Sequence, residues 1–387
     1  MSAENGALLA KNSALLAKNS ALRMEKHALR TELKKVPRYK HGSYTPGIQE
    51  WQDKWDKCAG KRILMYALTD FSGQLFRWAS AINRYTDYAA RMIVFYPHRY
   101  GYNLDLLFPF PGVLNSEILA LIAETDLIHI SDESGFLDGR NKLPPDLFTQ
   151  FGKPIVFTQY GGIARKLQKD PLYRNFVYSF SARIAMTPDL YYPWFDGYFI
   201  PQAIDTDEFQ YCWTDNRRLG HSPSTPARKG TEDLLMAIKG LDLEFDLITE
   251  VSYAQCLTRT QVCGLFFDQA GTEIKEKLGV DDVIGWYGYS AVVAAAYGIP
   301  TIAHLSQQAF VQARQAGKDI EERCAIINTP LGAEGIRETI LWYFNLPSHE
   351  KKRISLRTRA WVEEFHSYRV VARELARVYD SVLAEKG

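Results

Sequence analysis

The sequence lacks the features that define several large classes of protein. Its five cysteines are scattered through 387 residues without the spacing of metal ligands, which predicts free thiols in a reducing compartment. No apolar run reaches the length of a membrane-spanning helix, and the N-terminus has no uninterrupted apolar core of a signal peptide. The net charge is only +1, so the chain as a whole is not drawn to nucleic acid or an anionic membrane. These absences predict a soluble, cytoplasmic protein.

A dinucleotide-binding glycine motif is also missing. No Gly-x-Gly-x-x-Gly follows the first predicted strand, which argues against a dehydrogenase. The composition is otherwise that of a folded protein, because 46% of the residues are hydrophobic and 13% are aromatic. A chain of this length and composition has room for two domains with separate cores.

Residues 3–35 carry a heptad pattern. Leu8, Leu15, Leu22 and Leu29 recur every seven residues, and asparagine occupies three of the five positions that face them. Leucine at d with asparagine at a is typical of a parallel two-stranded coiled coil, although so many buried asparagines would weaken it. The pattern therefore predicts self-association through residues 3–35. A single amphipathic helix on the globular body is the alternative.

From residue 60 onward, short apolar runs alternate with helical patterns. Strands are predicted at 61–68, 91–96, 127–130, 154–158 and 184–186, and in a second unit at 245–248, 264–268 and 301–303. Helical stretches such as 74–85, 115–124, 231–241, 291–296 and 333–345 separate them or follow them. This alternation predicts two Rossmann-like, doubly wound α/β domains that face each other across a cleft.

The predicted boundaries follow from these patterns. They are 1–36 for the coiled-coil helix, 37–59 for a linker, 60–205 and 206–345 for the two Rossmann-like domains, and 346–387 for C-terminal helices that pack back on the first domain.

The stretch 221–231 has the composition of an anion-binding loop. Two prolines and several hydroxyl residues predict irregular structure that delivers Arg228 and Lys229 to the start of a helix. Thr231 is predicted to cap that helix, and Gly240 to end it. Adjacent cations beside exposed helix N–H groups favour binding of a phosphate. An ordinary solvated loop with two surface charges is the alternative.

A second candidate lies at 285–300. Ser290 is predicted to cap a helix whose first turn holds only apolar residues, so its positive end would be free for an anion. Gly288 would let the backbone approach a ligand closely. Tight packing of a helix rich in alanine explains the same residues without any ligand.

Several motifs together resemble the family-4 (group 1) glycosyltransferases of the GT-B fold. The donor-domain motifs are Lys229-Gly-Thr before a helix, Gly285-Trp-Tyr-Gly and Gly298-x-Pro. Ile200-Pro-Gln-Ala-Ile-Asp resembles the segment that links the two domains of that family, and Pro154-Ile-Val-Phe-Thr-Gln-Tyr-Gly resembles a first-domain strand and turn. The likeness spans about residues 60–385. It implies a nucleotide-sugar co-substrate, metal-independent transfer without a cofactor, and usually retention of anomeric configuration.

The resemblance also implies roles for individual residues. Lys229 matches the lysine that contacts the donor diphosphate, and Ser224 stands where the family has its partner arginine, so that Arg228 would replace it. The residues predicted to bind the donor are Ser222, Ser224, Gly230, Tyr287, Gly288, Tyr289, Ser290, Gly73, Gly161 and Arg165. On the acceptor side the candidates are His98, Arg99 and Tyr160.

The sequence departs from the family at its pair of glutamates, which map to Gly285 and Val293. Valine cannot accept the hydrogen bonds of a ribose. Four carboxylates are candidates to replace the missing pair: Asp281, Asp282, Asp268 and Glu250.

The sequence therefore predicts a glycosyltransferase that moves a sugar from a nucleotide-diphosphate donor to an acceptor hydroxyl, with Lys229 and Arg228 stabilising the leaving diphosphate. The acceptor, whether glycan, lipid, protein or nucleic acid, stays open. One alternative is a catalytically inactive relative that acts as a binding or scaffold protein assembled by the coiled coil. Another is a glycosyltransferase that modifies nucleic acid.

Overall fold

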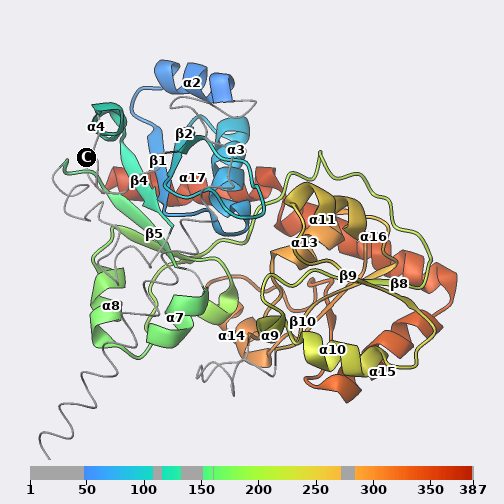
Figure 1. Cartoon of the computed structure of the whole chain (residues 1–387). Coiled ribbons are helices and arrows are strands. Elements are labelled where there is room, and N and C mark those ends of the chain that lie inside the picture. Colours follow the sequence, from blue (N-terminus) through green and yellow to red (C-terminus); the bar gives the residue numbers. More distant parts are fainter. Residues whose placement is uncertain (1–47, 108–115, 132–150, 160, 272–283, 386–387) are drawn as a thin grey trace, which may run out of the picture. The chain divides into compact units, whose positions relative to one another are not determined.

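The computed structural model describes residues 48–107, 116–131, 151–159, 161–271 and 284–385 (Figure 1). The heptad segment 3–35 lies outside these residues, and its self-association stays a prediction. Within the described ranges, every helix is too short or too polar to cross a membrane.

The first sheet consists of seven parallel strands in the order β3-β2-β1-β4-β5-β6-β7. The five predicted strands are present. The strands are β1 (Arg62–Ala67), β2 (Ala89–Val94), β3 (Leu106–Leu107), β4 (Leu127–Ile130), β5 (Ile155–Gln159), β6 (Ala182–Ala185) and β7 (Tyr198–Phe199). The helices around them are α2 (Ile48–Lys57), α3 (Gln74–Tyr85), α4 (Ser116–Glu124), α7 (Gly161–Leu167) and α8 (Pro171–Tyr178), with the 3-10 turns η1 (Phe71–Gly73) and η2 (Pro188–Leu190).

The second sheet has five parallel strands in the order β12-β11-β10-β8-β9. These are β8 (Arg218–His221), β9 (Glu244–Leu247), β10 (Leu265–Gln269), β11 (Thr301–Ala303) and β12 (Ile327–Asn328). The helices are α9 (Pro226–Lys229), α10 (Thr231–Ile238), α11 (Tyr253–Thr260), α13 (Tyr289–Ala296), α14 (Gln307–Gln315), α15 (Ala333–Asn345), α16 (Ser348–Phe365) and α17 (Tyr368–Ala384). Strand β8 was not predicted, because only four residues form it and the loop residues that follow dominate the pattern.

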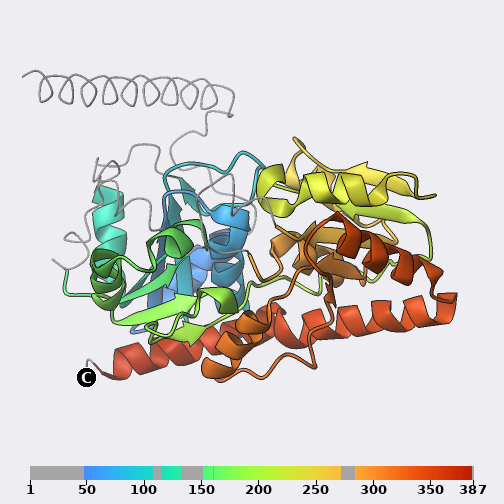
Figure 2. The ribbon, with the colours of Figure 1, turned by 90° about the horizontal axis from the view of Figure 1, so that it is seen from below.

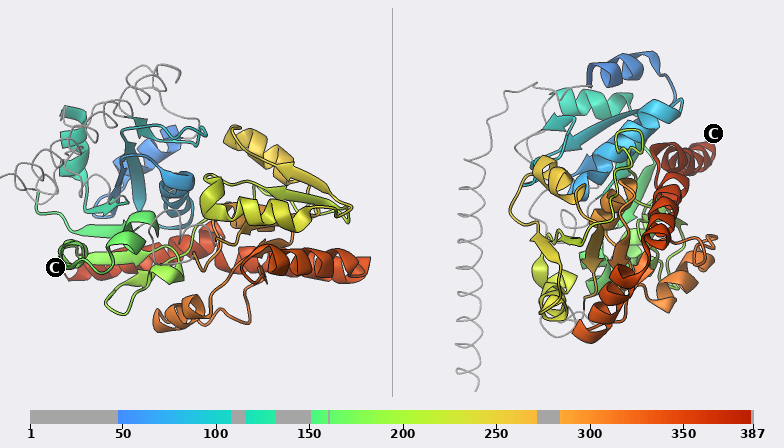
Figure 3. Two further views of the ribbon diagram at one scale, coloured as in Figure 1. Left: turned by 60° about the horizontal axis from the view of Figure 1, so that its bottom comes forward. Right: turned by 90° about the vertical axis from the view of Figure 1, so that its right-hand side faces the viewer.

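Both sheets are buried on both faces, which explains the continuous apolar runs. Alternate residues of a strand point in opposite directions, and in β1 Met65 joins a core with α3 and α17 while Leu64 joins a core with α4 and α8. In β10, Phe266 packs with α13, whereas Phe267 packs with α10 and α15. Helices accordingly lie on both sides of the second sheet (Figure 3). This is the predicted fold class of two doubly wound units.

The C-terminal stretch 349–385, predicted as helical, is two helices rather than one. Ile204 donates its N–H to the carbonyl of His366 at 2.9 Å and accepts from the N–H of Tyr368 at 3.1 Å, so the backbone at this point bonds outside the helix. Helix α17 then packs in the core of the first sheet beside α3 (Figure 2). The range predicted as a linker contains α2, which buries Ile48 and Trp55.

Three histidines are buried in these cores and are held neutral. Burial lowers the pKa of His129 to about 3, and that of His221 and His366 to about 4. In the unfolded chain a histidine titrates near 6.5. Between that value and the folded pKa only the unfolded state gains the proton, so stability is full above about pH 6.5 and falls as the pH drops towards 4.

We therefore expect the free energy of unfolding to fall by about 3 kcal/mol for each of these histidines across that range, since one pKa unit corresponds to about 1.4 kcal/mol. Urea unfolding at pH 7.5, 6.5, 5.5 and 4.5 measures the loss. His349 is exposed, so the variant His349→Gln should keep the wild-type profile. Equal stability at pH 7.5 and 4.5 would contradict this assignment of charge.

Candidate functional site

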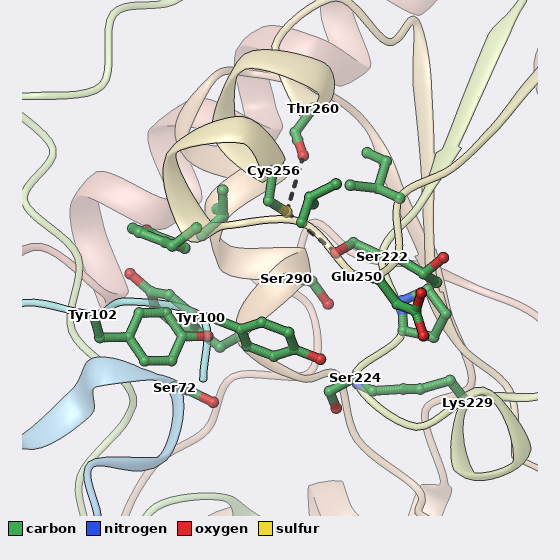
Figure 4. A pocket seen from close by; sticks show the side chains of 17 residues that line it. Ser72, Tyr100, Tyr102, Ser222, Ser224, Lys229, Glu250, Cys256, Thr260 and Ser290 are labelled. Atoms are coloured by element: carbon green, nitrogen blue, oxygen red, sulfur yellow. Dashed lines mark hydrogen bonds between the residues drawn. The ribbon is translucent and has the colours of Figure 1, made fainter. Parts of the chain in front are cut away.

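A cavity of about 110 Å³ lies beyond the carboxyl ends of β8 and β9, where ligands of parallel sheets commonly bind (Figure 4). Ser72 of η1, together with Tyr100 and Tyr102 of the loop after β2, forms one wall. The remaining lining residues, all from the second unit, are Ser222, Pro223, Ser224, Lys229, Ile248, Thr249, Glu250, Val251, Tyr253, Cys256, Thr260, Tyr289, Ser290 and Val293. The cavity therefore joins predicted residues of the second unit, among them Lys229 and Ser290, with three first-unit residues that the sequence did not single out.

Lys229 is positioned by a one-turn helix rather than by an irregular loop. It is the last residue of α9, and Gly230 then turns the chain with φ +70° into α10. A Cβ on Gly230 would collide with the carbonyl oxygen of Ala270, so glycine is required here for its conformation and for the close approach. The prediction that Thr231 caps α10 is wrong. Gly230 is the N-cap, and Thr231 is the first residue of the helix.

The hydroxyl of Thr231 instead fixes a buried histidine. His221 Nε2 lies 2.8 Å from Thr231 Oγ1, and His221 Nδ1 lies 2.9 Å from the carbonyl oxygen of Phe267. A carbonyl only accepts, so Nδ1 carries the hydrogen and Nε2 accepts from Thr231. His221 thereby joins β8, β10 and the start of α10, and holds the α9–α10 turn at the sheet.

Asp268 is the partner of Lys229. The lysine Nζ lies 3.1 Å from Asp268 Oδ1, where the aspartate side chain has no exposed surface and the lysine side chain is 15% exposed. The same carboxylate accepts from Ser290 Oγ and from the backbone N–H of Gly288, both at 2.5 Å. An ammonium, a hydroxyl and a backbone N–H therefore converge on one anionic group.

This arrangement corrects the prediction for the second helix. Gly288, not Ser290, is the N-cap of α13, and Ser290 lies inside the first turn with its hydroxyl on Asp268. The start of the helix is consequently not free for an external anion, because the Asp268 carboxylate already occupies it. A Cβ on Gly288 would lie 2.6 Å from Lys229 Nζ, so glycine leaves room for the ammonium group beside this backbone.

Arg228 lies beside the first unit and not in this cluster. Its guanidinium Nη1 lies 3.6 Å from the place that a Cβ on Gly162 would take, at the start of α7 in the first unit. Arg228 is exposed and does not line the cavity. Its role as the partner of Lys229 stays a prediction.

A loop of the first unit bridges to the second beside the cavity. Arg99 donates to the carbonyl oxygen of Ser224 at 3.0 Å, and Tyr100 accepts from the backbone N–H of Tyr253 at 2.9 Å. The rings of His98 and Tyr102 pack with centroids 4.8 Å apart and planes tilted by 31°, and burial lowers the pKa of His98 to about 4. His98 and Arg99 therefore support and close the cavity wall; contact with an acceptor stays a prediction.

Other predicted site residues lie away from the cavity. Tyr287 is buried, with its hydroxyl 3.0 Å from His366 Nε2, and belongs to the core. Arg165 pairs with Asp189 through Nε at 3.0 Å and folds over Gly161.

Gly73 and Tyr160 were also predicted to belong to the site. Gly73 lines a separate cavity of about 410 Å³ beside Arg77. Tyr160 lies outside the described residues.

Glu250 brings a carboxylate to the same cavity. It is one of two non-glycine residues in the described chain with a positive φ, at +53°. Figure 4 shows its side chain on the same side of the cavity as Lys229, opposite Tyr100 and Tyr102. Among the carboxylates named above, Glu250 lines the cavity and Asp268 contacts the lining residues Lys229 and Ser290, whereas Asp281 and Asp282 fall outside the described residues. No cluster of three or more metal-ligating side chains occurs in the described part of the chain.

No protein-family model and no curated protein matches the chain. Solved structures do. HepE of Anabaena, in complex with UDP-glucose, is 14% identical over 83% of this chain and 99% of its own, with a TM-score of 0.55. An alpha-glucosyltransferase in complex with UDP and DNA containing an HMU base is 8% identical over 84% and 99%, with a TM-score of 0.57. The N-terminal domain of Candida albicans trehalose-6-phosphate phosphatase is 10% identical over 83% and 97%, with a TM-score of 0.53.

These similarities, together with the two parallel sheets, show that the chain has the GT-B fold. The predicted fold is thus confirmed. At such low identity the likeness establishes the architecture alone, since one fold hosts many activities.

Proposed function

We propose that the protein is a glycosyltransferase that takes its sugar from a nucleoside-diphosphate donor bound in the Lys229 cavity. The observation that supports this most is the convergence of Lys229 Nζ, Gly288 N–H and Ser290 Oγ on one anionic position beside the cavity. Donors that converge on an anionic group are the kind that bind the oxygens of a diphosphate. The structures of HepE and the alpha-glucosyltransferase, bound to UDP-glucose and UDP respectively, have the same fold and support the same class of donor.

The cavity has separate regions for the parts of such a donor. Ile248, Val251 and Val293 supply an apolar region for a nucleobase, and Lys229 with the nearby Gly288 N–H receives the anionic diphosphate. Glu250 provides a carboxylate that accepts hydrogen bonds from the ribose hydroxyls. Glu250 would therefore take the place of the glutamate whose position Val293 occupies.

In the transfer step the bond between the anomeric carbon and the diphosphate oxygen breaks, and a bond to the acceptor oxygen forms. Lys229 and the Gly288 N–H stabilise the charge that develops on the leaving diphosphate. We propose attack from the face that the diphosphate leaves, so the acceptor proton passes to a departing phosphate oxygen and configuration is retained. In this scheme the protein groups alone stabilise the charge, and no step is assigned to a metal.

The donor enters through a change of conformation. A volume of about 110 Å³ is smaller than the roughly 300–1,000 Å³ of typical small-molecule sites. The contacts of Arg99 with Ser224 and of Tyr100 with Tyr253 bridge the two units beside the cavity. Opening them admits the donor, and their return excludes water during transfer.

Mass spectrometry tests the activity directly. The protein is incubated with a panel of nucleotide-sugars and an extract of its host, and products heavier by one sugar are sought. We expect one donor to be consumed with a matching product. If nucleoside diphosphates bind but no donor is consumed, the protein is a binding protein on this fold instead.

Glu250 gives a second test, because its backbone is strained. A left-handed conformation costs a non-glycine residue roughly 1 kcal/mol, and glycine adopts it freely. We expect Glu250→Gly to raise the melting temperature and to weaken binding of a nucleoside diphosphate about tenfold or more, the range for a hydrogen bond to a charged group. Stability gained together with affinity lost is typical of strain kept for function.

The matched variant is Glu250→Gln, which keeps the size and the strained backbone. Wild type should prefer a ribonucleoside diphosphate to its 2′-deoxy form, and Glu250→Gln should reduce that preference. Calorimetry with the two nucleotides decides it. An unchanged preference in both variants would remove Glu250 from the ribose site.

A further inference from the structure

The three donors of the proposed diphosphate site all bind a carboxylate that belongs to the chain. Asp268 receives Lys229 Nζ at 3.1 Å, and Ser290 Oγ and Gly288 N–H at 2.5 Å each. It lies near the carboxyl end of the central strand β10, and its side chain has no exposed surface. The site therefore already contains one full negative charge.

That charge opposes the binding of a diphosphate. Two unit charges 4 Å apart interact strongly when water is excluded, and like charges repel by the same amount. Lys229 has a single ammonium group, which Asp268 neutralises. Conversely, a half-buried lysine without a partner is unfavourable, so the pair stabilises the protein whenever the phosphate position is not filled.

We propose that Asp268 is an exchangeable counter-ion of the donor site: the diphosphate displaces its carboxylate from Lys229 on binding, and the carboxylate returns to Lys229 as the nucleoside diphosphate leaves. This rests on the proposed function. Ser290 remains bound to Asp268 during the exchange and retains the carboxylate nearby. The return of Asp268 to Lys229 lowers the affinity for the product nucleoside diphosphate and speeds its release.

The test uses inorganic pyrophosphate, which carries the diphosphate charge without a nucleobase or sugar. We expect Asp268→Asn in the full chain to bind pyrophosphate at least about tenfold more tightly than wild type, because one opposing charge is gone. Asp268→Ala removes the same charge without an amide and should shift the affinity in the same direction. The gain should disappear in the double variant of Asp268→Asn with Lys229→Met.

Turnover gives a signature that a merely structural role would not produce. With a working donor, Asp268→Asn should lower both KM and kcat, because donor and product are both held longer. Pyrophosphate affinity that is unchanged or weaker in both folded single variants would overturn the proposal, and would show instead that Asp268 positions Lys229 for the phosphate.

A structure of the wild-type protein with pyrophosphate decides the matter without any substitution. Lys229 Nζ should contact the pyrophosphate and no longer Asp268; a bound pyrophosphate beside an intact pair would overturn the exchange. The outcome is separable from the proposed function. If the Asp268 variants bind pyrophosphate more tightly but no nucleotide-sugar is consumed, the exchange is supported and the transferase is rejected. If sugar is transferred but the Asp268 variants bind pyrophosphate as wild type does, the transferase is supported and the exchange is rejected.

Discussion

Replacing Lys229 with methionine should lower kcat/KM for glycosyl transfer by about 10²- to 10³-fold, the usual loss when one group that stabilises developing negative charge is removed. Methionine has a similar length and no charge, so the cavity keeps its shape. Product formed per minute from the working nucleotide-sugar measures the effect. The loss should appear in nucleoside-diphosphate binding as well, because Lys229 contacts the diphosphate both before and during transfer.

The controls separate charge at the site from charge in general. Lys239, just beyond the end of α10, does not line the cavity, and Lys239→Met should keep wild-type activity. Lys229→Met leaves Asp268 buried without its cation, so some loss of stability is expected. Combining it with Asp268→Asn should restore stability but not transfer. Wild-type activity in Lys229→Met would reject the proposed role of this residue.

The second large effect concerns the first unit. Asp105→Ala should lower the free energy of unfolding by about 3–5 kcal/mol, because it leaves a buried charge without its partner. Arg91 donates to Asp105 through Nε at 2.7 Å and Nη2 at 3.0 Å, and both side chains are at most 1% exposed. The backbone N–H of Met92 donates to the same carboxylate at 3.0 Å. Asp105 therefore ties the end of the loop that carries His98 and Arg99 to strand β2.

Urea unfolding measures this difference, and an exposed ion pair supplies the control. Asp207 pairs with Arg84 at 3.0 Å but is 63% exposed, so Asp207→Ala should cost less than about 1 kcal/mol. If Asp105→Ala were as stable as Asp207→Ala, the buried pair would be stabilising neither β2 nor the loop. We also expect Asp105→Ala to weaken donor binding, since the loop bridges to Ser224.

The strands were predictable from the sequence where a run of apolar residues fills both buried faces of the strand. Runs such as 127–130 and 264–268 contain little but apolar residues, and each forms a strand within one residue of its predicted position. Strand β8 was not, because Gly220 and His221 carry no β pattern, and its pairing with β9 and β10 is what makes it a strand. Tertiary contacts decide such short elements.

The site was predictable at Lys229 and less so around it. A lysine before Gly230 and a helix gives a local signal, since only glycine fits against Ala270. The partner Asp268 sits 39 residues further on, and only the pairing of β8 with β10 brings the two together. The free helix start predicted at Ser290 was wrong for the same reason: the sequence shows that the first turn has no acidic residue, but not that one arrives from β10.

Calorimetric titration of a panel of nucleoside diphosphates into wild type and Lys229→Met tests the central proposal most directly. We expect at least one member of the panel to bind wild type, and to bind Lys229→Met at least about tenfold more weakly, as loss of a charge-assisted contact requires. Binding of equal strength to both proteins would place the diphosphate elsewhere. No binding of any member to wild type would contradict the donor site itself.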